Sequence, residues 1–352
     1  MGARMTTGAG GAVAKELGFG TLATNWAEGL DAVGRPPYEV ALPPPDEGTE
    51  LLRRLGVPET DAAEVIATLP SVAGTPAWWW LLERSCHWLT LAMGNPDEPH
   101  FTWPDWAGTE HAYSLQHRCF TAHVFLAVLP HTTAWHRSRG ISEDISWASM
   151  ADLGRHMAIH RRTYGATGVD AAWWVTVCLR AEVFDLGRLQ FNWFRLGIGD
   201  ASPWWYSLEE AGRRGMGFRP RDFCVGVHIP ESGPMTPTGC DDSFELAKGF
   251  FSEHFPLGDQ RRRLATCWSW LLDDQLADWL PPESNIVRFQ RRFELVPGSI
   301  VNDEGILEFV FRMPDPLGQL DDLPQRTRLE RAVVAHLKAG GHWRTRSGWV
   351  DL

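Results

Sequence analysis

The stretch FCVGVHIPESGPMTPT, residues 223–238, holds the residue types and spacing best suited to chemistry. Apolar residues alternate with others through its first half, which predicts a strand with Cys224, Gly226 and His228 on one face. The pair Thr236-Pro237 is typical of the first residues of a helix. A sharp break between strand and helix exposes backbone N–H groups, which can bind an anion. An imidazole at the end of the strand can accept a proton near neutral pH.

The loop between that strand and that helix has features of a phosphate-binding loop. Gly233 can adopt a positive φ, and Ser232 can present its backbone N–H to a ligand. Thr236 can cap the helix, whose N-terminus then directs a partial positive charge toward the loop. Gly226 lacks a side chain, so a ligand can approach the backbone beside His228. The alternative is an ordinary strand-to-helix connection that binds nothing.

Two other histidine patterns are weaker. His156 and His160 have the i, i+4 spacing of helical metal ligands, but they lack an adjoining Glu and a third ligand. A structural role is therefore favoured, and we expect no metal. His254 and Asp259 match the HxxxxD pattern of membrane glycerolipid acyltransferases, yet the chain has no membrane segment, so coincidence is favoured. The sequence also lacks a GxSxG nucleophile elbow and a P-loop.

Composition predicts a globular protein that binds no nucleic acid and inserts into no membrane. The chain has 352 residues, of which 44% are hydrophobic and 22% charged, enough to build a full core. Its formal net charge of −11 opposes binding to a phosphate backbone. The longest apolar runs contain charged residues or histidine and fall short of the ~20 residues of a membrane span. We therefore expect a cytoplasmic location.

Tryptophan and cysteine usage adds two expectations. Nineteen Trp against four Tyr predict either an aromatic-rich core or a ligand site lined partly by Trp. The six cysteines are scattered, form no CxxC pair and mostly sit in apolar segments. This pattern favours buried thiols in a reducing compartment over a disulfide framework.

The first half of the chain has a helical pattern. Residues 1–20 are rich in Gly, Ala and Thr and are predicted to form a disordered tail, whereas residues 21–186 are predicted to form a helical domain. Thr75-Pro76 predicts the start of one helix. Ser149 and Asp152 have the spacing of a capping box for another. No strand is predicted in this half.

Strands and helices alternate from residue 187 onward. The predicted strands are 186–197, 223–230, 265–272, 285–296 and 307–312, with a closing hairpin in 342–350. The predicted helices are 237–254, 273–279 and 327–339. A helix between two successive strands implies a parallel pair, and the closing strands imply antiparallel pairs. The fold class is therefore α+β, with a helical N-terminal domain followed by a mixed α/β domain over residues 187–352.

Five stretches carry a family resemblance: SWASMADLGRHMAIHRRTYG, LGRLQFNWF, GVHIPESGPMTP, SWLLDDQLADWLPPESNIVRFQRRF and LPQRTRLERAVVAHLKAGGHW. They run from about residue 145 to the end of the chain, and they resemble the actinobacterial two-domain N-acyltransferases. That family joins a helical N-terminal domain to a GNAT-like acyltransferase domain. It includes the enzymes that attach fatty acyl chains to the amino sugar of teicoplanin-type glycopeptides.

The resemblance implies transfer of an acyl group from acyl-CoA to an amine of a small molecule or natural product. It places the acyl-CoA against the strand before the central helix. The residues implied in CoA binding are Val227, Ile229, Glu231, Ser232, Gly233, Thr236 and Thr238. The usual GNAT pyrophosphate motif, Gln/Arg-x-x-Gly-x-Gly/Ala, is absent before this helix, and Arg213–Gly217 lies on the wrong side of the strand. The loop must therefore bind the pyrophosphate by another route.

Acyl transfer needs a base for the ammonium, donors for the oxyanion and a proton for the thiolate. His228 is the predicted base, with a backbone N–H of residue 228 or 229 as the oxyanion donor. GNAT enzymes often protonate the thiolate with a Tyr after the next strand, and no Tyr lies at that place here, so Ser269 or solvent takes that role. Three further residues are predicted substrate contacts: Trp193, with core packing as its alternative, and the weaker candidates Asn285 and Arg288.

A second class of function is a non-catalytic protein that binds acyl-CoA or another ligand on a GNAT-like scaffold. The missing pyrophosphate motif and the missing Tyr favour this alternative. The position of His228 beside Gly226 favours an enzyme.

Overall fold

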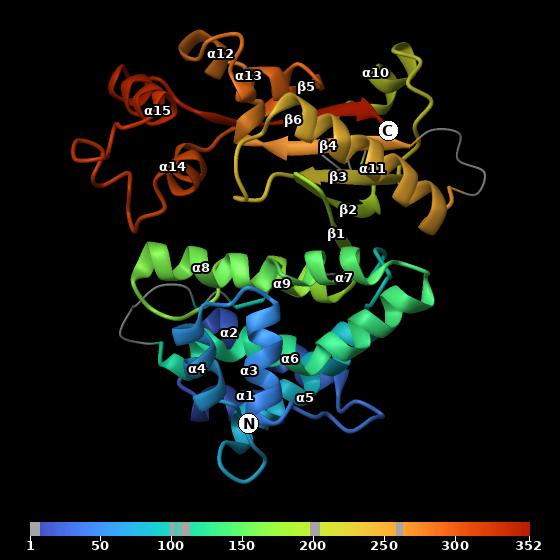
Figure 1. Cartoon of the computed structure of the whole chain (residues 1–352), viewed down its shortest axis with the longest axis vertical. Helices are drawn as coiled ribbons and strands as arrows, with labels where there is room; N and C mark the ends of the chain where they lie inside the picture. Colours follow the sequence, from blue (N-terminus) through green and yellow to red (C-terminus); the bar gives the residue numbers. More distant parts are fainter. Residues whose placement is uncertain (1–7, 99–102, 105, 107–112, 198–204, 258–262) are drawn as a thin grey trace, which may run out of the picture. The chain divides into compact units, whose positions relative to one another are not determined.

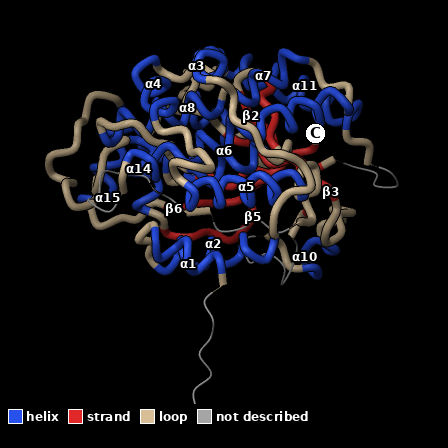
Figure 2. Tube along the Cα trace, turned by 90° about the horizontal axis from the view of Figure 1, so that it is seen from below, coloured by secondary structure: helices blue, strands red, loops and turns tan. Residues whose placement is uncertain are grey.

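The computed structural model describes the chain except for residues 1–7, 99–102, 105, 107–112, 198–204 and 258–262. The chain divides into two compact units, Met1–Glu182 and Val183–Leu352. The described part of the first unit is helical, and every described strand belongs to the second unit. Figure 2 shows the helices in blue and the strands in red. The predicted second domain began at residue 187, whereas the second unit begins with a strand at Val183 that the sequence pattern did not reveal.

The first unit is built from helices packed around aromatic side chains. Rings of Trp26, Trp106 and Phe120 meet edge to face with centroid distances of 5.7 to 6.0 Å. Much of the tryptophan in this unit therefore fills a core. The described helices are α1 (Ala9–Glu16), α2 (Thr21–Val33), α3 (Pro45–Arg54), α4 (Glu59–Ala67), α5 (Pro76–Leu91), α6 (Leu115–Ser138), α7 (Glu143–Met150), α8 (Asp152–Tyr164) and α9 (Ala172–Leu179).

Two predictions for this unit are wrong. The stretch predicted as a disordered tail contains helix α1, whose Val13 and Ala14 are buried. Residues 1–7 lie outside the described residues. Ser149 does not cap a helix, because its hydroxyl donates to Ile145 O inside α7, and Asp152 is simply the first residue of α8. The predicted start of α5 at Thr75-Pro76 is confirmed.

The second unit contains one six-stranded sheet with the order β1-β2-β3-β4-β6-β5 (Figure 1). Strands β3 and β4 are parallel, and all other neighbours are antiparallel, which confirms the predicted mixed sheet. Helix α11 (Pro237–His254) makes the crossover between the parallel strands, with the predicted bounds. The strands are β1 (Val183–Leu186), β2 (Leu189–Arg195), β3 (Phe223–His228), β4 (Leu264–Ser269), β5 (Glu294–Val301) and β6 (Arg344–Asp351).

Three predictions in the last seventy or so residues are wrong. The remaining helical elements are α10 (Leu208–Arg213), η2 (Trp270–Leu272), α12 (Leu276–Trp279), α13 (Asn285–Gln290), α14 (Asp303–Phe311) and α15 (Arg328–Lys338). Helix α13 occupies the first half of the predicted strand 285–296, and α14 occupies the predicted strand 307–312. No closing hairpin forms, because β6 is a single strand between β4 and β5. The predicted helix over 327–339 is confirmed as α15.

Capping residues explain why two apolar alternations became helices. The Ser284 hydroxyl accepts from Val287 N and starts α13. The Asn302 amide accepts from Gly305 N at 2.9 Å and starts α14. A short run of apolar residues fits helix and strand almost equally well, so a satisfied N-cap decides between them.

The two faces of the sheet differ in what covers them. Helix α11 packs on one face, where Phe191 of β2 meets Phe244 of the helix with ring centroids 5.8 Å apart. Side chains alternate along a strand, so Gln190, Asn192 and His228 lie together on the opposite face. The candidate histidine therefore shares its face with polar residues of β2.

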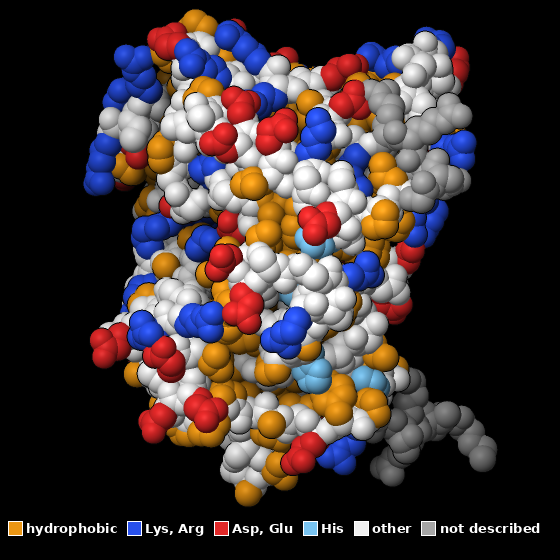
Figure 3. All heavy atoms as spheres, turned by 45° about the vertical axis from the view of Figure 1, so that its right-hand side comes forward, with side chains coloured by type: hydrophobic (Ala, Val, Ile, Leu, Met, Phe, Trp, Pro, Cys, Tyr) orange, Lys and Arg blue, Asp and Glu red, His pale blue; other side chains and the backbone are white. Residues whose placement is uncertain are grey.

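Surface charge is mixed in sign. On the face shown in Figure 3, Lys and Arg side chains are interspersed with Asp and Glu side chains. None of the described helices combines the length and the apolar character needed to cross a membrane.

All six cysteines are buried free thiols, which confirms the expectation from their spacing. Burial raises the pKa of Cys119 and that of Cys267 to about 12. Burial also raises the pKa of Cys86, Cys224 and Cys240.

Candidate active site

Strand β3 pairs differently with its two neighbours. It pairs with β2 along its whole length, and His228 faces Gln190 across that ladder. Its parallel pairs with β4 end at Gly226 and Thr266, among the residues that the structure describes, although β4 continues to Ser269. The backbone of residues 227–229 therefore lies where the two central strands part.

His228 is held by a side chain of β2. Its Nε2 lies 2.7 Å from the Oδ1 of Asn192, and the histidine side chain is half-buried. An amide oxygen can only accept, so the ring donates from Nε2 and keeps the lone pair on Nδ1. The arrangement sets which ring nitrogen can act as a base. Sequence reasoning missed Asn192.

Gly226 makes room for that hydrogen bond. A Cβ at this position would overlap Asn192 Oδ1 and would lie 3.1 Å from His228 Nε2. Asn192 and Gly226 are partners across the β2–β3 ladder, so the amide lies directly over the glycine. We expected Gly226 to admit a ligand to the backbone. The structure shows instead that its open space holds the Asn192 amide.

In the loop after β3, Gly233 has the predicted backbone conformation, but the backbone N–H of Ser232 is not exposed to a ligand as predicted. Gly233 has a φ of +120°, a conformation that favours glycine, as predicted. The Ser232 N–H, however, donates to Pro230 O at 2.8 Å and is not available to a ligand. Residues 231–234 are exposed. Backbone N–H groups for an anion must therefore come from the glycine and the residues after it.

The Arg188 side chain binds three backbone carbonyls of this loop. Its Nε donates to Pro234 O at 3.1 Å, and its two terminal nitrogens donate to Pro230 O at 3.0 Å and Gly233 O at 2.6 Å. Burial lowers the pKa of the guanidinium, which nevertheless stays charged at neutral pH. The arginine thus satisfies these carbonyls as hydrogen-bond acceptors and adds positive charge beside the loop. It is a second residue that the sequence analysis missed.

The N-terminus of α11 is capped as predicted. The Thr236 hydroxyl accepts from Gly239 N at 3.2 Å, Pro237 is the first helical residue, and Thr238 is exposed in the first turn. The carboxylate of Glu231 is bound by Arg312, with Oε2 and Nε 3.1 Å apart. This ion pair offsets a negative charge that would otherwise repel a phosphate.

Ser269 ends β4 and caps the short helix η2. Its oxygen accepts from Leu271 N at 3.1 Å, which leaves the hydroxyl hydrogen to donate elsewhere. Thr266 shares a face with Gly226 through their pairing, so alternation turns the Ser269 side chain toward the other face. The residue borders the place where the strands part, and its side chain is on the opposite face of the sheet from His228.

The three predicted substrate contacts lie on other elements or on the other face of the sheet. Trp193 is buried on the α11 face, where its ring lies 4.9 Å from that of Phe255. Asn285 and Arg288 lie on helix α13 rather than at the start of a strand. Their contribution to substrate binding stays a prediction.

The two helical histidines, His156 and His160, lie beside other polar groups of the first unit. No group of three or more His, Cys, Asp or Glu side chains is arranged to hold a metal ion within the described ranges. His160 Nδ1 lies 2.8 Å from Ala166 O, and His156 lies 3.7 Å from a carboxylate oxygen of Asp152. Asp259, the second residue of the HxxxxD match, lies outside the described residues.

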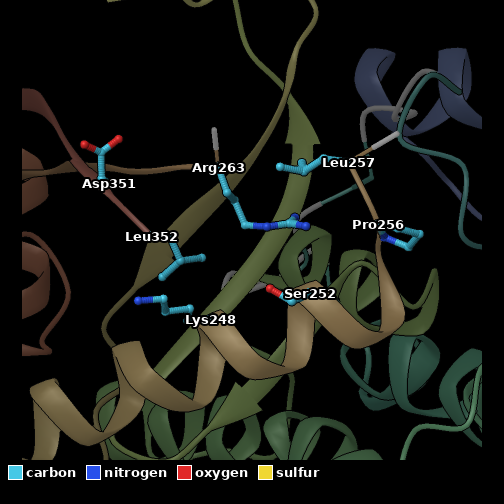
Figure 4. Close-up of a pocket in the computed structure, with 7 residues that line it drawn as sticks. All are labelled: Lys248, Ser252, Pro256, Leu257, Arg263, Asp351 and Leu352. Carbon is cyan, nitrogen blue, oxygen red and sulfur yellow. The ribbon is translucent and has the colours of Figure 1, made fainter. Parts of the chain in front are cut away.

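Two hollows of the second unit lie elsewhere. The larger, of about 540 Å³, is lined by Lys248, Ser252, Pro256, Leu257, Arg263, Asp351 and Leu352 (Figure 4). Arg263 comes just before Leu264, which pairs with Cys224 near the start of β3. This hollow is therefore at the opposite end of β3 from His228. The guanidinium donates to Phe251 O and Phe255 O and so caps the end of α11.

The smaller hollow has a volume of about 320 Å³ and an apolar lining. Asn285 lies at this hollow, between the α13 start and the first residues of α15.

Comparison with known families identifies both units. Residues 46–181 match the N-acyltransferase N-terminal domain, and residues 183–350 match the GNAT-like C-terminal domain. A comparison with curated protein sequences found no match.

Solved structures give matches over nearly the whole chain. An acyltransferase in complex with decanoyl-CoA and teicoplanin is 38% identical, with a TM-score of 0.84. A variant acyltransferase in complex with octanoyl-CoA is 37% identical, with a TM-score of 0.85. An acyltransferase in complex with CoA and 10C-teicoplanin is 37% identical, with a TM-score of 0.84. Each match covers 97% of this chain and 99% of the other.

The chain therefore belongs to the two-domain GNAT-like N-acyltransferases. It is an enzyme that uses acyl-CoA as its co-substrate and transfers the acyl group to an amine. The predicted family, fold class and type of reaction are confirmed.

Proposed function

We propose that this enzyme transfers a medium-length fatty acyl group from acyl-CoA to the amino sugar of a teicoplanin-type glycopeptide. Support comes from its similarity to acyltransferases whose complexes hold octanoyl-CoA, decanoyl-CoA and teicoplanin. The observation that carries the proposal is the Asn192–His228 hydrogen bond, 2.7 Å long, at the place where β3 and β4 part. It provides an oriented base beside an open stretch of strand.

In this proposal His228 is the general base. The Nε2–H donated to Asn192 leaves Nδ1 to take a proton from the substrate ammonium. The amine nitrogen then attacks the thioester carbonyl carbon, and the carbonyl electrons move to oxygen. The intermediate collapses when the C–S bond breaks and the nitrogen gives up its second proton, which reaches the departing CoA thiolate through the Ser269 hydroxyl or through solvent. The products are the amide and free CoA. The Asn192 oxygen stabilises the imidazolium that forms meanwhile.

The CoA site in this proposal is the loop between β3 and α11. The pantetheine lies along the backbone of Val227 and Ile229, where β4 no longer pairs. The pyrophosphate lies over Gly233 and the N-terminus of α11, near the hydroxyls of Thr236 and Thr238. Arg188 supplies positive charge and fixes the loop carbonyls away from the phosphates.

Ser269 is the proposed proton donor to the thiolate, with solvent as the alternative donor. Its hydroxyl hydrogen is available because the oxygen already accepts from Leu271 N. A cytoplasmic location goes with this function, because acyl-CoA is a cytoplasmic thioester.

The proposal is tested by incubating the purified chain with decanoyl-CoA and a glycopeptide that carries a free amino sugar. We expect thiol release together with a product heavier by one decanoyl group, located on the sugar by fragmentation. Aglycone without the sugar serves as the control acceptor and should stay unmodified. Acylation of the aglycone, or rapid thiol release without an acylated product, would contradict the proposed acceptor.

A further inference from the structure

Gln190 carries a buried amide nitrogen that makes no hydrogen bond within the described part of the chain. The residue lies on β2 and is 2% exposed. Its Nε2 is buried and has no hydrogen-bond partner among the residues that the structure describes. Buried donors are nearly always paired in folded proteins, and an unpaired one destabilises the fold. A donor left unpaired in this way is a place where a ligand is expected.

A second buried glutamine of the same unit shows the usual situation. Gln290 is 9% exposed, and its Nε2 donates to Leu271 O and to Asp273 O, both at 2.8 Å. The two residues have the same side chain in similar burial. Only Gln190 leaves its Nε2 without an acceptor.

Gln190 stands next to the base. It is the partner of His228 across the β2–β3 ladder, and of Asp185 across the β1–β2 ladder. Partners in an antiparallel ladder share a face with Cβ atoms about 4.5–5.5 Å apart, so the amide reaches the surroundings of the imidazole. The His228 ring donates to Asn192, and the Gln190 Nε2 is not hydrogen-bonded to the ring.

We propose that Gln190 is a catalytic residue, whose Nε2–H binds the thioester carbonyl oxygen and stabilises the oxyanion that forms on it. This inference rests on the proposed function. When the amine attacks, charge develops on that oxygen, and a fixed donor in a buried position stabilises it strongly. No proton moves in this step. The N–H remains on Gln190 while the C–N bond forms and the C–S bond breaks.

The burial of Gln190 favours the thioester oxygen over a hydroxyl of the acceptor. A glycopeptide is large and meets the enzyme over exposed surface, whereas the thioester is carried to the end of β3 by a narrow pantetheine chain. An oxyanion donor also acts best where water is excluded. Gln190 satisfies that condition with 2% exposure.

A pair of matched variants tests the role. Gln190→Met keeps the volume and removes the donor, and we expect kcat to fall about 10²–10³-fold with the acceptor KM within a few-fold. Because no native hydrogen bond is lost, the Tm should stay the same or rise. Gln290→Met removes two native hydrogen bonds, so its Tm should fall while kcat stays within about twofold. If Gln190→Met does not fold, Gln190→Leu removes the same donor without adding charge and gives the same kinetic test.

Difference infrared spectroscopy with [1-¹³C]decanoyl-CoA gives a readout that needs no acceptor. The carbonyl band of the bound thioester should lie at lower wavenumber in the wild type and in Gln290→Met than in Gln190→Met. Unchanged band positions in all three proteins would overturn the proposal. So would a Gln190→Met variant that raises the acceptor KM alone, or one that loses Tm and activity together.

The experiment separates this inference from the function on which it rests. If wild-type protein fails to bind decanoyl-CoA, the proposed function itself fails. If it binds decanoyl-CoA but acylates no glycopeptide, the acceptor is wrong while the infrared shift still decides the role of Gln190.

Discussion

Replacing Asn192 by Asp changes the charge beside the base with little change in shape. The Asn192 oxygen lies 2.7 Å from His228 Nε2, so the new carboxylate meets the ring at hydrogen-bond distance. An anion so close favours the imidazolium and raises the pKa of the ring by roughly 1–2. The base must be neutral to accept a proton. The rising limb of activity against pH should therefore move to higher pH by the same amount.

The size of the effect depends on pH in a way that a purely structural role does not reproduce. At a pH below the pKa of both proteins, raising the pKa of the base by one lowers kcat/KM about tenfold. Above the new pKa the variant should regain most of the wild-type rate. Asn192→Ala should behave differently, because it removes the orienting bond without adding charge. We expect it to be slower at every pH, roughly 10–10²-fold, with its limb unmoved. Gly226→Ala should resemble it, since the added Cβ would overlap the Asn192 oxygen.

The assay is kcat/KM for amide formation, measured by chromatography from about pH 6 to about pH 10. Asn302→Asp serves as the control, because it adds the same charge to the same unit at a helix N-cap that accepts Asp equally well. Its limb should coincide with that of the wild type. If kcat/KM of the Asn192→Asp variant rises over the same pH range as that of the wild type, Asn192 does not act through the base, and His228 loses its proposed role.

Three further outcomes are expected. His228→Ala should lower kcat about 10²–10⁴-fold, with acyl-CoA affinity by calorimetry within a few-fold and with the low-pH inflection gone; loss of Tm and CoA affinity together would indicate a structural histidine. Gly233→Val should weaken CoA binding, because valine rarely adopts a φ of +120°, and Arg188→Gln should weaken it by loosening the same loop; equal CoA affinity in folded variants would place the cofactor elsewhere. Burial lowers the pKa of His136 to about 4. Between pH 6.5 and 4 the unfolded chain therefore binds a proton that the folded chain does not, and the free energy of unfolding decreases as the pH is lowered. At about pH 5 the loss from this ring is about 2 kcal/mol, and His136→Gln should show a shallower fall of Tm from pH 7 to 5; an unchanged slope would contradict the buried neutral ring.

The parts of the fold that could be predicted are those decided by neighbouring residues. Strand β3 and helix α11 follow from a local alternation, a Thr cap and a Pro at the first helical position, and the structure confirms them. The stretch at 285–296 could not be read correctly, because its apolar residues fit either periodicity. The choice depended on the side chain of Ser284, which lies just outside the alternation.

The candidate site divides in the same way. His228, Gly226 and Gly233 lie within eight residues of one another and were found together. Asn192 and Gln190 act across a ladder whose partners are up to 38 positions apart, and the register of two strands cannot be read from one sequence. One signal was available. Both are polar residues that alternate with buried apolar ones along β2, which marks a strand face with a purpose other than packing.

The burial of the thiols has a consequence for the chemistry around the enzyme. Every turnover releases a free thiol, so a cysteine on the surface would be open to disulfide exchange with oxidised CoA. All six cysteines of this chain are buried, and burial disfavours the thiolate that such exchange requires. The folded enzyme should therefore work in its own product without being modified by it. A disulfide reagent that releases a coloured thiolate should likewise react only with the CoA thiol while the chain is folded. After unfolding it should detect six additional thiols per molecule.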